Sequence, residues 1–561
     1  MRKQLSYVIT LTLIFLVVVG CNPAGQAVSE PENTIHVNQL GYLPDGHKSA
    51  IIIGPSEGFL IVDVDSKKIV HTGELSAPQQ WAASGEDARI ADFSSFSAPG
   101  NYVLIAGGSG SHQFEISRDV YSDVAKASIK AFYFHRASTA LDEKYAGVYA
   151  RTAGHPDTQV GIHASAASES RPEGTKISAP KGWYDAGDFG KYIVNSAITV
   201  TTMMSVFEHY PEKSGMISTN IPESGDETPD LLDEIKWNLD WMLTMQDPQD
   251  GGVYHKLTTK SFPGMIMPEE DTEPRWIVMK TTPATLDFVA SMAQASRVYK
   301  PYDSEFSEQC LTAALKAWEW TQNNMEVYYT QPEDIHTGAY DQPGKGFKDE
   351  KFWAATELSI TTGETYESEI PSPLLVPEWR DGAALASMNL LNYQEDEAVK
   401  KVFFVLADSL LKAQMASPYD VSNDYFRWGS TSDFLNQAMI LLYAYKASGE
   451  KAYKDAAQST FDWVLGKNPT GYSFVTGFGQ KTAKHIHHRP SEGDAIAEPQ
   501  PGWVIGGPNP ENKEDCGEDA YTSPYPALAY MDQLCSYATN EIAINWNGVF
   551  VYVAIALDAE G

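Results

Sequence analysis

The fold class of this 561-residue chain is decided by one stretch, TPDLLDEIKWNLDWMLTM, which occupies residues 228–245. Thr228 can cap a helix whose first residue is Pro229, because proline is tolerated at the first helical position. The apolar side chains that follow recur at helical spacing: Leu231, Leu232, Ile235, Leu239, Met242 and Met245. The stretch therefore predicts an amphipathic helix with one face in a core.

The same periodicity recurs along most of the chain. It covers about 120–141, 192–209, 283–299, 304–325, 350–362, 381–393, 397–415, 432–448, 451–465 and 541–557. With the first stretch these make eleven candidate helices, enough for a closed ring of paired helices. We expect a mostly α domain over residues 119–561.

The connections in this helical part are long, glycine-rich and aromatic. They are residues 142–191, 247–282, 326–349 and 466–540. Long loops in a compact domain are usually functional, since function sits on loops held by a rigid scaffold. The chemistry is expected there.

Residues 34–117 have a different pattern. Short β-branched runs such as Ile51-Ile52-Ile53 and Leu60-Ile61-Val62 alternate with glycine and proline turns. Several strands in so short a segment predict a small all-β sandwich of immunoglobulin type. The segment lacks the Cys…Trp…Cys spacing, so this prediction rests on the strand pattern alone.

The N-terminus has the pattern of an export signal. Arg2 and Lys3 precede an apolar stretch, and Gly20 then stands directly before Cys21. This order is typical of a lipoprotein signal peptide over residues 1–20, with Cys21 as the lipidated N-terminus of the mature chain. The alternatives are an unlipidated, cleaved signal peptide and an unprocessed anchor. We expect residues 21–33 to form a tether, and the protein to be an exported bacterial lipoprotein on the outer membrane, the cell surface or the periplasmic face.

An exported protein can form disulfides, so the pairing of the other cysteines has to be considered. Without Cys21 the chain keeps three: Cys310, Cys516 and Cys535. One disulfide is possible, and Cys516 and Cys535 are the nearer pair in sequence, but the sequence does not establish that they are joined.

The composition excludes one class of partner. There are 74 acidic against 41 basic side chains, a net charge of −33. A surface this acidic repels phosphate backbones, so we expect no binding to nucleic acid. The 29 Tyr, 22 Phe and 13 Trp residues can build a core or stack on sugars, and composition does not decide between these uses.

The first loop motif is GWYDAGDFGKY, residues 182–192. Asp185 and Asp188 are separated by Ala and Gly, which let the chain turn tightly and bring both carboxylates to one small volume, such as a bound water or a cation. The alternative is that they cap the helix expected near Tyr192. The pattern alone leaves both open.

The second motif is SFVTGFGQKTAKHIHHR, residues 473–489. Its last five residues hold His485, His487, His488 and Arg489, which can bind a metal, a polyol or an anion. Zinc would need a further ligand. The alternative is a solvated loop with one structural histidine.

The third motif joins Tyr530-Met531-Asp532 to TNEIAINWN, residues 539–547. Glu541 would open the final helix, where a carboxylate is favoured by the helix dipole. That position is itself the simpler explanation of this residue.

Together the three motifs resemble glycoside hydrolase family 9, the inverting β-glucanases with an (α/α)6 barrel. The resemblance runs through Asp185-Ala186-Gly187-Asp188, through Ser473, Gly479, Lys481, Ile486, His487 and Arg489, and through Tyr530, Asp532, Tyr537, Glu541, Ala543 and Asn547. Residues 36–42 (HVNQLGY) resemble the immunoglobulin-like module that precedes the barrel in one branch of the family. The resemblance covers about residues 34–558.

The resemblance implies a role for each motif. Inversion needs one carboxylic acid to protonate the leaving oxygen and one carboxylate to activate a water on the opposite ring face. Glu541 would be the general acid, with a raised pKa, and Asp188 the base, with Asp185 helping to hold the water. The resemblance also assigns substrate-side or supporting positions to His487, Arg489 and Asp532: the first two would bind sugar hydroxyls, and Asp532 would support the acid loop.

Four aromatic residues are candidates to line a sugar-stacking cleft: Trp183, Tyr184, Trp428 and Trp546. Each can equally belong to the barrel core.

The resemblance also bears on metals. Some relatives hold a structural zinc with two Cys and two His before the first motif, where this chain keeps His155 and His163 but has no cysteine. We therefore expect no zinc. Asp349, Glu350 and Asp381 match positions where relatives hold calcium, and their oxygens suit that ion; the alternative is that they cap helices.

The resulting expectation is a lipid-anchored, monomeric, inverting β-1,4-glucanase that needs no cofactor for its chemistry. Its substrate would be a plant β-glucan of the cellulose, xyloglucan or mixed-linkage type, cleaved in endo mode. Three alternatives remain: an exo-acting member that releases short oligosaccharides, a non-catalytic glycan-binding lipoprotein and a metallohydrolase built on the histidines.

Overall fold

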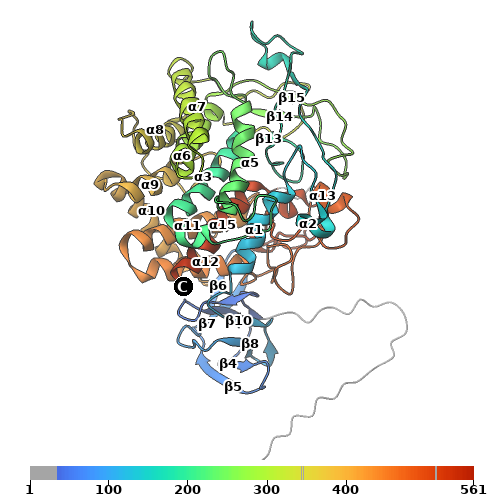
Figure 1. The fold of residues 1–561 in the computed structure, drawn as a ribbon. Helices are drawn as coiled ribbons and strands as arrows, with labels where there is room; N and C mark the ends of the chain where they lie inside the picture. The colour runs from blue at the N-terminus through green and yellow to red at the C-terminus, as the bar shows by residue number, and fades with distance from the viewer. Residues whose placement is uncertain (1–34, 343, 345, 512–514, 518) are drawn as a thin grey trace, which may run out of the picture.

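The computed structural model describes residues 35–561 except 343, 345, 512–514 and 518. The expected signal peptide, Cys21 and the tether lie outside the described residues. A β-rich part over residues 35–116 sits against a larger helical body that begins at residue 122 (Figure 1). In this described part, no helix combines the length and apolar character that crossing a membrane requires.

The β-rich part is a sandwich of two sheets. Its strands are β1 Ile35–His36, β2 Gly41–Tyr42, β3 Ser49–Ile53, β4 Gly58–Asp63, β5 Ile69–Glu74, β6 Gln79–Trp81, β7 Glu86–Asp92, β8 Gly100–Ala106, β9 Ser109–Gly110 and β10 Phe114–Ile116. One sheet has the order β1-β3-β7-β6, and the other β2-β10-β8-β4-β5 with β9 beside β8. On β8 the buried residues alternate, Tyr102, Leu104 and Ala106, as expected for a strand with one face in a core. The predicted all-β immunoglobulin-like part is confirmed.

Each of the eleven predicted stretches contains a helix. They are α1 Ser122–Phe134, α3 Ile193–His209, α5 Asp230–Thr244, α6 Thr282–Tyr299, α7 Ser304–Asn323, α8 Lys348–Thr362, α9 Ala383–Tyr393, α10 Glu397–Ala416, α11 Ser430–Ser448, α12 Lys451–Val464 and α15 Ile544–Glu560. Four short helices lie in the connections: α2 Glu143–Ala146, α4 Pro211–Gly215, α13 Arg489–Gly493 and α14 Tyr537–Asn540. The start of α5 differs by one residue from the prediction. Pro229 is its N-cap, in an extended conformation, and no side chain caps the helix, so Thr228 does not have the predicted role.

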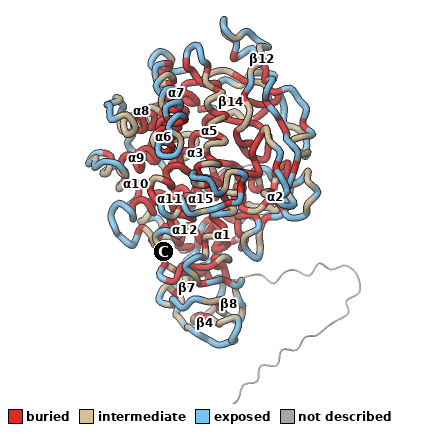
Figure 2. Tube along the Cα trace, viewed as in Figure 1, coloured by how far each residue is buried: buried red, intermediate tan, exposed pale blue. Residues whose placement is uncertain are grey.

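Six of the long helices form an inner ring. Each packs against the next in the order α15, α3, α6, α8, α9, α11 and back to α15. Helices α3 and α15 are buried on nearly every side, whereas α1, α5, α7, α10 and α12 bury one face and lie outside the ring. The buried residues accordingly occupy the middle of the helical body and the exposed ones its outer loops (Figure 2). This is the predicted (α/α)6 barrel, and the fully described segment 363–382 contains no helix where the sixth outer one would lie.

A small sheet built from the long connections covers one end of the barrel. Its strands are β11 Val160–Ile162, β12 Lys176–Ile177, β13 Lys191–Tyr192, β14 Lys256–Thr258 and β15 Trp276–Ile277, in the order β12-β11-β15-β14-β13. Strand β13 runs directly into the inner helix α3. The loop before β13, which holds the first motif, is therefore fixed both by this sheet and by the barrel.

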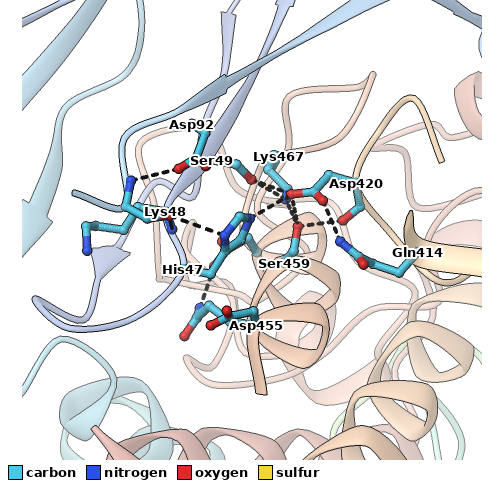
Figure 3. Close-up of polar contacts among 12 residues, drawn as sticks. His47, Lys48, Ser49, Asp92, Gln414, Asp420, Asp455, Ser459 and Lys467 are labelled. Carbon is cyan, nitrogen blue, oxygen red and sulfur yellow. Dashed lines mark hydrogen bonds and ion pairs between the residues drawn. The ribbon is translucent and has the colours of Figure 1, made fainter. Parts of the chain in front are cut away.

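A buried polar cluster joins the sandwich to the barrel (Figure 3). From the sandwich, His47 Nε2 lies 2.9 Å from Asp420 Oδ2, and the Ser49 hydroxyl donates to the same oxygen at 2.8 Å. From the barrel side, the Lys467 ammonium donates to Ser49 at 2.9 Å and lies 3.5 Å from Asp420. Burial alone would raise the pKa of Asp420, but the charge of Lys467 and the hydrogen bond from His47 hold it far below its usual range.

Replacement of Asp420 tests how much this cluster stabilises the protein. Asn is the suitable substitute because Asp420 has φ 58°, a left-handed conformation that Asn also adopts. Asp420→Asn leaves the fully buried Lys467 without its counter-charge, and we expect it to lower the free energy of unfolding by about 3–5 kcal/mol in guanidinium titrations.

The matched control is Glu369→Gln, which breaks an ion pair with Lys348 whose side chains are 82% and 80% exposed. It should cost at most about 1 kcal/mol. Equal losses in the two variants would contradict a stabilising role of the cluster.

Candidate active site

The first motif forms a tight turn at the mouth of the barrel. The Asp185 N–H donates to the Gly190 carbonyl at 3.0 Å and closes the turn, which carries both aspartates. Helix α3 has Tyr192 as its N-cap and no side-chain cap bond, so neither aspartate caps this helix. The alternative offered for this motif is thereby excluded.

Both aspartates are buried and held by hydrogen bonds. Asp185 accepts from the Asn195 amide at 2.7 Å and from the Tyr340 hydroxyl at 2.6 Å. Asp188 accepts from the Gly190 N–H at 2.8 Å and from the Tyr192 hydroxyl at 3.4 Å. Burial, reinforced by the charge of Asp188, raises the pKa of Asp185 to about 8.

The third motif runs alongside the first. Ala186 and Ala543 form an antiparallel bridge, and the Ile544 N–H donates to the Asp185 carbonyl at 2.9 Å. The Gly187 N–H points to Glu541 Oε1 at 3.3 Å. Backbone pairing thus places the Glu541 carboxyl next to the loop that carries Asp185 and Asp188. Glu541 precedes α15, whose N-cap is Ala543, so its place is set by this pairing.

The second motif completes the site from the other side. His487 pairs with Glu541 in a parallel bridge, and its N–H donates to the Asn540 carbonyl at 2.9 Å. Its ring Nδ1 lies 2.9 Å from the Leu534 carbonyl, which can only accept, so Nδ1 carries the proton and Nε2 is left as the acceptor. Arg489 donates from Nη1 to the Gly187 carbonyl at 2.7 Å and so ties this motif to the first.

Asp532, from the third motif, holds the loops of the site in place through hydrogen bonds. Asp532 accepts the backbone N–H groups of Lys484 and His485 at 2.9–3.0 Å and the Asn540 amide at 3.1 Å. These bonds fasten the segment before His487 and the residue before Glu541 to the same carboxylate. His485 is exposed, whereas His488 is buried with its Nε2 2.6 Å from Nε2 of His135.

A disulfide fixes the segment that approaches His487. It joins Cys516 to Cys535, the pairing that the sequence left open, and Cys535 follows Leu534, whose carbonyl orients the His487 ring. Cys310 is a free thiol buried in α7.

Burial and the neighbouring charges favour the protonated form of Glu541, as they do that of Asp185. Burial raises the pKa of Glu541 to about 8, and the charges of Asp188 and Asp185 add to the rise while Arg489 opposes it. Glu541 is therefore protonated at neutral pH, as a general acid must be. Burial lowers the pKa of His487, so this ring is neutral in the same range.

Two of the four aromatic candidates do not reach the site surface. Trp183 and Tyr184 are both 0% exposed. The Trp183 indole donates to Glu234 at 2.8 Å, and the Tyr184 hydroxyl pairs with His155 at 2.8 Å. The prediction that they line a sugar-stacking cleft is wrong, because successive side chains of this loop turn inward to anchor it on α5 and on its neighbours.

The other two aromatic candidates differ from each other. Trp546 is only 8% exposed and is covered by Gly429 and Gly506. Trp428 is 41% exposed, and its ring centroid lies 5.5 Å from that of Tyr537, which is itself 5.8 Å from the His487 ring. Trp428 and Tyr537 thus form an exposed aromatic pair beside the histidine.

Three residues of the site were not predicted from the sequence as site residues. Tyr537 lies in the third motif, four residues before Glu541, and that position could have indicated it. Tyr340 and Lys256 come from the long connections and carry no spacing signal. Only the fold shows that the Tyr340 hydroxyl reaches Asp185 and that Lys256 pairs with Tyr192, whose hydroxyl lies 3.4 Å from Asp188.

The predicted calcium residues do not form one cluster. Asp381 precedes Gly382, the N-cap of α9, and its carboxylate accepts the N–H of Ala383, the first residue of that helix, at 3.1 Å. Glu350 is buried in the first turn of α8, and burial together with Asp349 and Asp287 raises its pKa well above the usual range. Among the described residues no group of three or more His, Cys, Asp or Glu side chains is arranged to hold a metal.

The two histidines that match the zinc position of relatives are paired with carboxylates. His155 Nε2 lies 3.2 Å from Asp271, and His163 Nε2 lies 3.0 Å from Asp334. Each ring thus has an acidic partner within the loops that surround the first motif.

Comparison with known proteins decides the family. Residues 121–554 match the model of glycosyl hydrolase family 9, and residues 30–111 match that of the cellulase N-terminal ig-like domain. The chain belongs to glycosyl hydrolase family 9. The predicted family is confirmed, and the protein is a glycoside hydrolase of an inverting family whose members need no cofactor for catalysis.

Relatives of this family 9 enzyme match it along nearly its whole length. A xyloglucan-specific endo-beta-1,4-glucanase of Bacteroides ovatus is 39% identical and covers 99% of each chain. Endoglucanase D of Acetivibrio thermocellus is 31% identical over 98% of this chain and 86% of its own. Among solved structures, a Bacteroides ovatus family 9 protein superimposes with a TM-score of 0.88 at 40% identity, covering 95% of this chain and 100% of its own.

Gly187 is the position where the three motifs come closest in this family 9 site. A Cβ at this residue would lie 2.2 Å from the His487 carbonyl oxygen and 3.0 Å from Glu541 Oε1. Gly187→Ala must therefore push the motifs apart, and misplacement by about 1 Å can cost on the order of 100-fold in rate. We expect at least that loss in kcat/KM on a soluble β-glucan.

Gly215→Ala is the matched control, since a Cβ there meets only Phe207 at an ordinary 3.9 Å. It should retain wild-type activity. Unchanged kcat/KM in Gly187→Ala would contradict the close approach of the three motifs.

Proposed function

We propose that this enzyme is an endo-acting β-1,4-glucanase whose substrate is a soluble plant β-glucan, with xyloglucan as the first candidate. One observation carries the catalytic part: backbone pairing sets a carboxyl of raised pKa, Glu541, against a loop with two buried aspartates. The substrate class is supported by the full-length relative from Bacteroides ovatus, whose name states xyloglucan specificity.

In the proposed mechanism Glu541 is the general acid. Its proton goes to the glycosidic oxygen as the bond from that oxygen to the anomeric carbon breaks. Asp188 is the general base: it takes a proton from a water that attacks the anomeric carbon from the opposite face, so that configuration inverts. Glu541 leaves the step ionised and Asp188 protonated, and exchange with solvent restores both.

The neighbouring groups position this pair. Asp185, held by Asn195 and Tyr340, lies in the same turn as Asp188 and would hold the attacking water. His487 offers a neutral ring nitrogen to a sugar hydroxyl. Arg489 would orient the sugar from the same motif, and its bond to the Gly187 carbonyl keeps base and acid motifs together.

We propose that Trp428 and Tyr537 stack on the sugar chain. Their rings are exposed, adjacent to each other and next to His487. Flat aromatic faces pack against the apolar faces of glucose units, so this pair would extend the binding surface away from the site of cleavage.

Replacement of the two catalytic carboxyls tests the function. Asp188→Asn and Glu541→Gln should each lower kcat on xyloglucan by about 100-fold or more, because each removes a proton-transfer group. Solution viscosity should fall early in the wild-type reaction, as endo cleavage requires. The control is Glu498→Gln, which alters only an exposed pair with Lys484.

The pH dependence of kcat in the wild-type enzyme is a further test of the role of Glu541. Glu541 acts in its protonated form and its pKa is raised to about 8, so wild-type activity should hold to that pH and fall as pH rises through it. Full activity in either carboxyl variant would contradict the mechanism. Release of one short oligosaccharide with little loss of viscosity would instead indicate the exo-acting alternative.

We further propose a structural calcium ion between α6 and α8. Asp287 and Glu350 are both buried, the Asp349 charge raises the pKa of each, and among the described residues neither forms an ion pair with a basic side chain. Oxygen ligands of this type suit calcium. Calcium would supply the positive charge that these carboxyls lack, and it would take no part in the chemistry.

Thermal unfolding tests the calcium proposal. Carboxyls with raised pKa values destabilise the metal-free protein as pH rises and they ionise, so added calcium should raise Tm more at pH 8 than at pH 5. Glu350→Gln removes one charge and should abolish most of that calcium-dependent gain. A Tm that does not respond to calcium or to a chelator at pH 8 would contradict the proposal.

Finally, we propose that the enzyme is a monomer anchored to a bacterial membrane through a lipid on Cys21 and exported by the signal of residues 1–20. The support is the sequence pattern: a charged start, an apolar run and a small residue before the cysteine. A tethered enzyme of this kind would act on glucan chains at the cell surface or in the periplasm.

A further inference from the structure

Lys256 is a fully buried lysine on β14 that no predicted role accounts for. Its Nζ donates to the Gly338 carbonyl at 2.6 Å, to Gln331 at 3.1 Å and to Thr337 at 3.2 Å. Three acceptors use all three of its protons, so the ammonium group is held in one place.

This place lies directly behind the two aspartates of the active site. In the ladder between β13 and β14, Lys256 is the cross-strand partner of Tyr192, and its Nζ lies 5.6 Å from the Tyr192 ring. The Tyr192 hydroxyl in turn lies 3.4 Å from Asp188. Gly338, which accepts from Lys256, is two residues before Tyr340, whose hydroxyl donates to Asp185 at 2.6 Å.

Among the described residues Lys256 forms no ion pair within 4.0 Å. Its acceptors are all neutral, and the carboxylate whose charge acts on it is Asp188. A buried ammonium whose hydrogen-bond partners are neutral still exerts the electric field of its full positive charge on nearby groups. A carboxylate bonded directly to it would cancel most of that field.

We propose that Lys256 is a positioning residue for the catalytic base: its ammonium keeps Asp188 ionised from behind, and its hydrogen bonds fix the segment that carries Tyr340. This inference rests on the proposed role of Asp188 as base. The small sheet at the barrel mouth then contributes to the reaction, since its strand β14 places Lys256 behind Asp188.

The balance of charge around Asp188 explains why such a cation matters. The titratable groups that face it from the surrounding elements are Asp185, Tyr192, Lys256, Tyr340, His487 and Glu541. Asp185 and Glu541 favour protonation of Asp188 only where they are ionised, the tyrosines are neutral, and His487 is neutral. Lys256 opposes protonation of Asp188, whereas the charge of Arg489 acts on Glu541, whose pKa it lowers.

The pH range in which Lys256 is charged agrees with this role. Burial lowers its pKa to about 7, and the Asp188 charge resists that fall. The ammonium is therefore present below pH 7, where the base has to stay ionised. Removal of this charge makes Asp188 easier to protonate, so the acidic limb of the rate profile should move to higher pH.

The test is the pH profile of kcat/KM on xyloglucan for Lys256→Met. An opposite charge in a protein commonly lowers a carboxyl pKa by about 1 unit, so we expect the acidic limb to move up by roughly that amount. Lys256→Arg, which keeps the charge, should restore the limb toward its wild-type position.

The matched control is Thr337→Val, which removes the hydrogen bonds of this hydroxyl to Lys256, Thr258 and Tyr192 but leaves the charge of the lysine. It should leave the limb in place. Thr337→Asp keeps the lysine but neutralises its field, and it should shift the limb in the same direction as Lys256→Met. This variant carries the test if Lys256→Met does not fold.

The outcomes separate this inference from the proposed function. An acidic limb that stays within about 0.2 units in Lys256→Met or, failing that, in Thr337→Asp overturns the role of Lys256. So does an equal shift in Thr337→Val, which would show a purely structural effect. Wild-type activity in Asp188→Asn would instead overturn the proposed function itself.

Discussion

The active site depends on backbone pairing between segments that are distant in sequence, the first and third motifs by more than 300 residues. The bridge between Ala186 and Ala543 and the bridge between His487 and Glu541 bring three loops together. These contacts are made by the main chain, so they do not depend on the motif side chains. Gly187 sits at the centre of this arrangement, and the space around it has no room for a side chain.

The rest of the fold holds these loops in register. The inner ring of helices ends at the loops: α3 begins directly after the first motif, and α15 begins within the third. The small sheet adds a second anchor through β13 and β14. The sandwich contributes from the opposite end, where the buried cluster around Asp420 and Lys467 fastens it to the barrel. A rigid scaffold on every side suits chemistry in which two carboxyls must keep a fixed separation.

Much of this could be predicted from the sequence because periodicity is a local property. Helical spacing of apolar residues identified the eleven long helices, and β-branched runs between turns identified the sandwich. The pattern of the first and third motifs left their alternatives open, and only the resemblance to the family assigned catalytic roles to their carboxyls. The first and last residues of a helix are harder to predict. Helix α5 begins one residue later than predicted, since Pro229 takes the extended conformation of an N-cap.

What could not be predicted depends on three-dimensional packing. Trp183 and Tyr184 stand next to Asp185 in sequence, yet both side chains turn into the core. The direction of each side chain in this tight loop is set by the residues packed around the loop. Tyr340 and Lys256 lie far from the motifs in sequence. Tyr340 donates to Asp185 from the loop before α8, and Lys256 is paired with Tyr192 in the small sheet. Asp287, on another helix from Glu350, likewise comes close to it only in the folded barrel.

The most direct test of the account is the configuration of the first product. If Glu541 and Asp188 act as acid and base on opposite faces of the ring, water replaces the leaving group in a single displacement. Proton NMR of a fresh digest of a β-glucan oligosaccharide should then show the α-anomer at the new reducing end before mutarotation. Initial formation of the β-anomer would contradict the central claim, since it requires a covalent intermediate and two displacements.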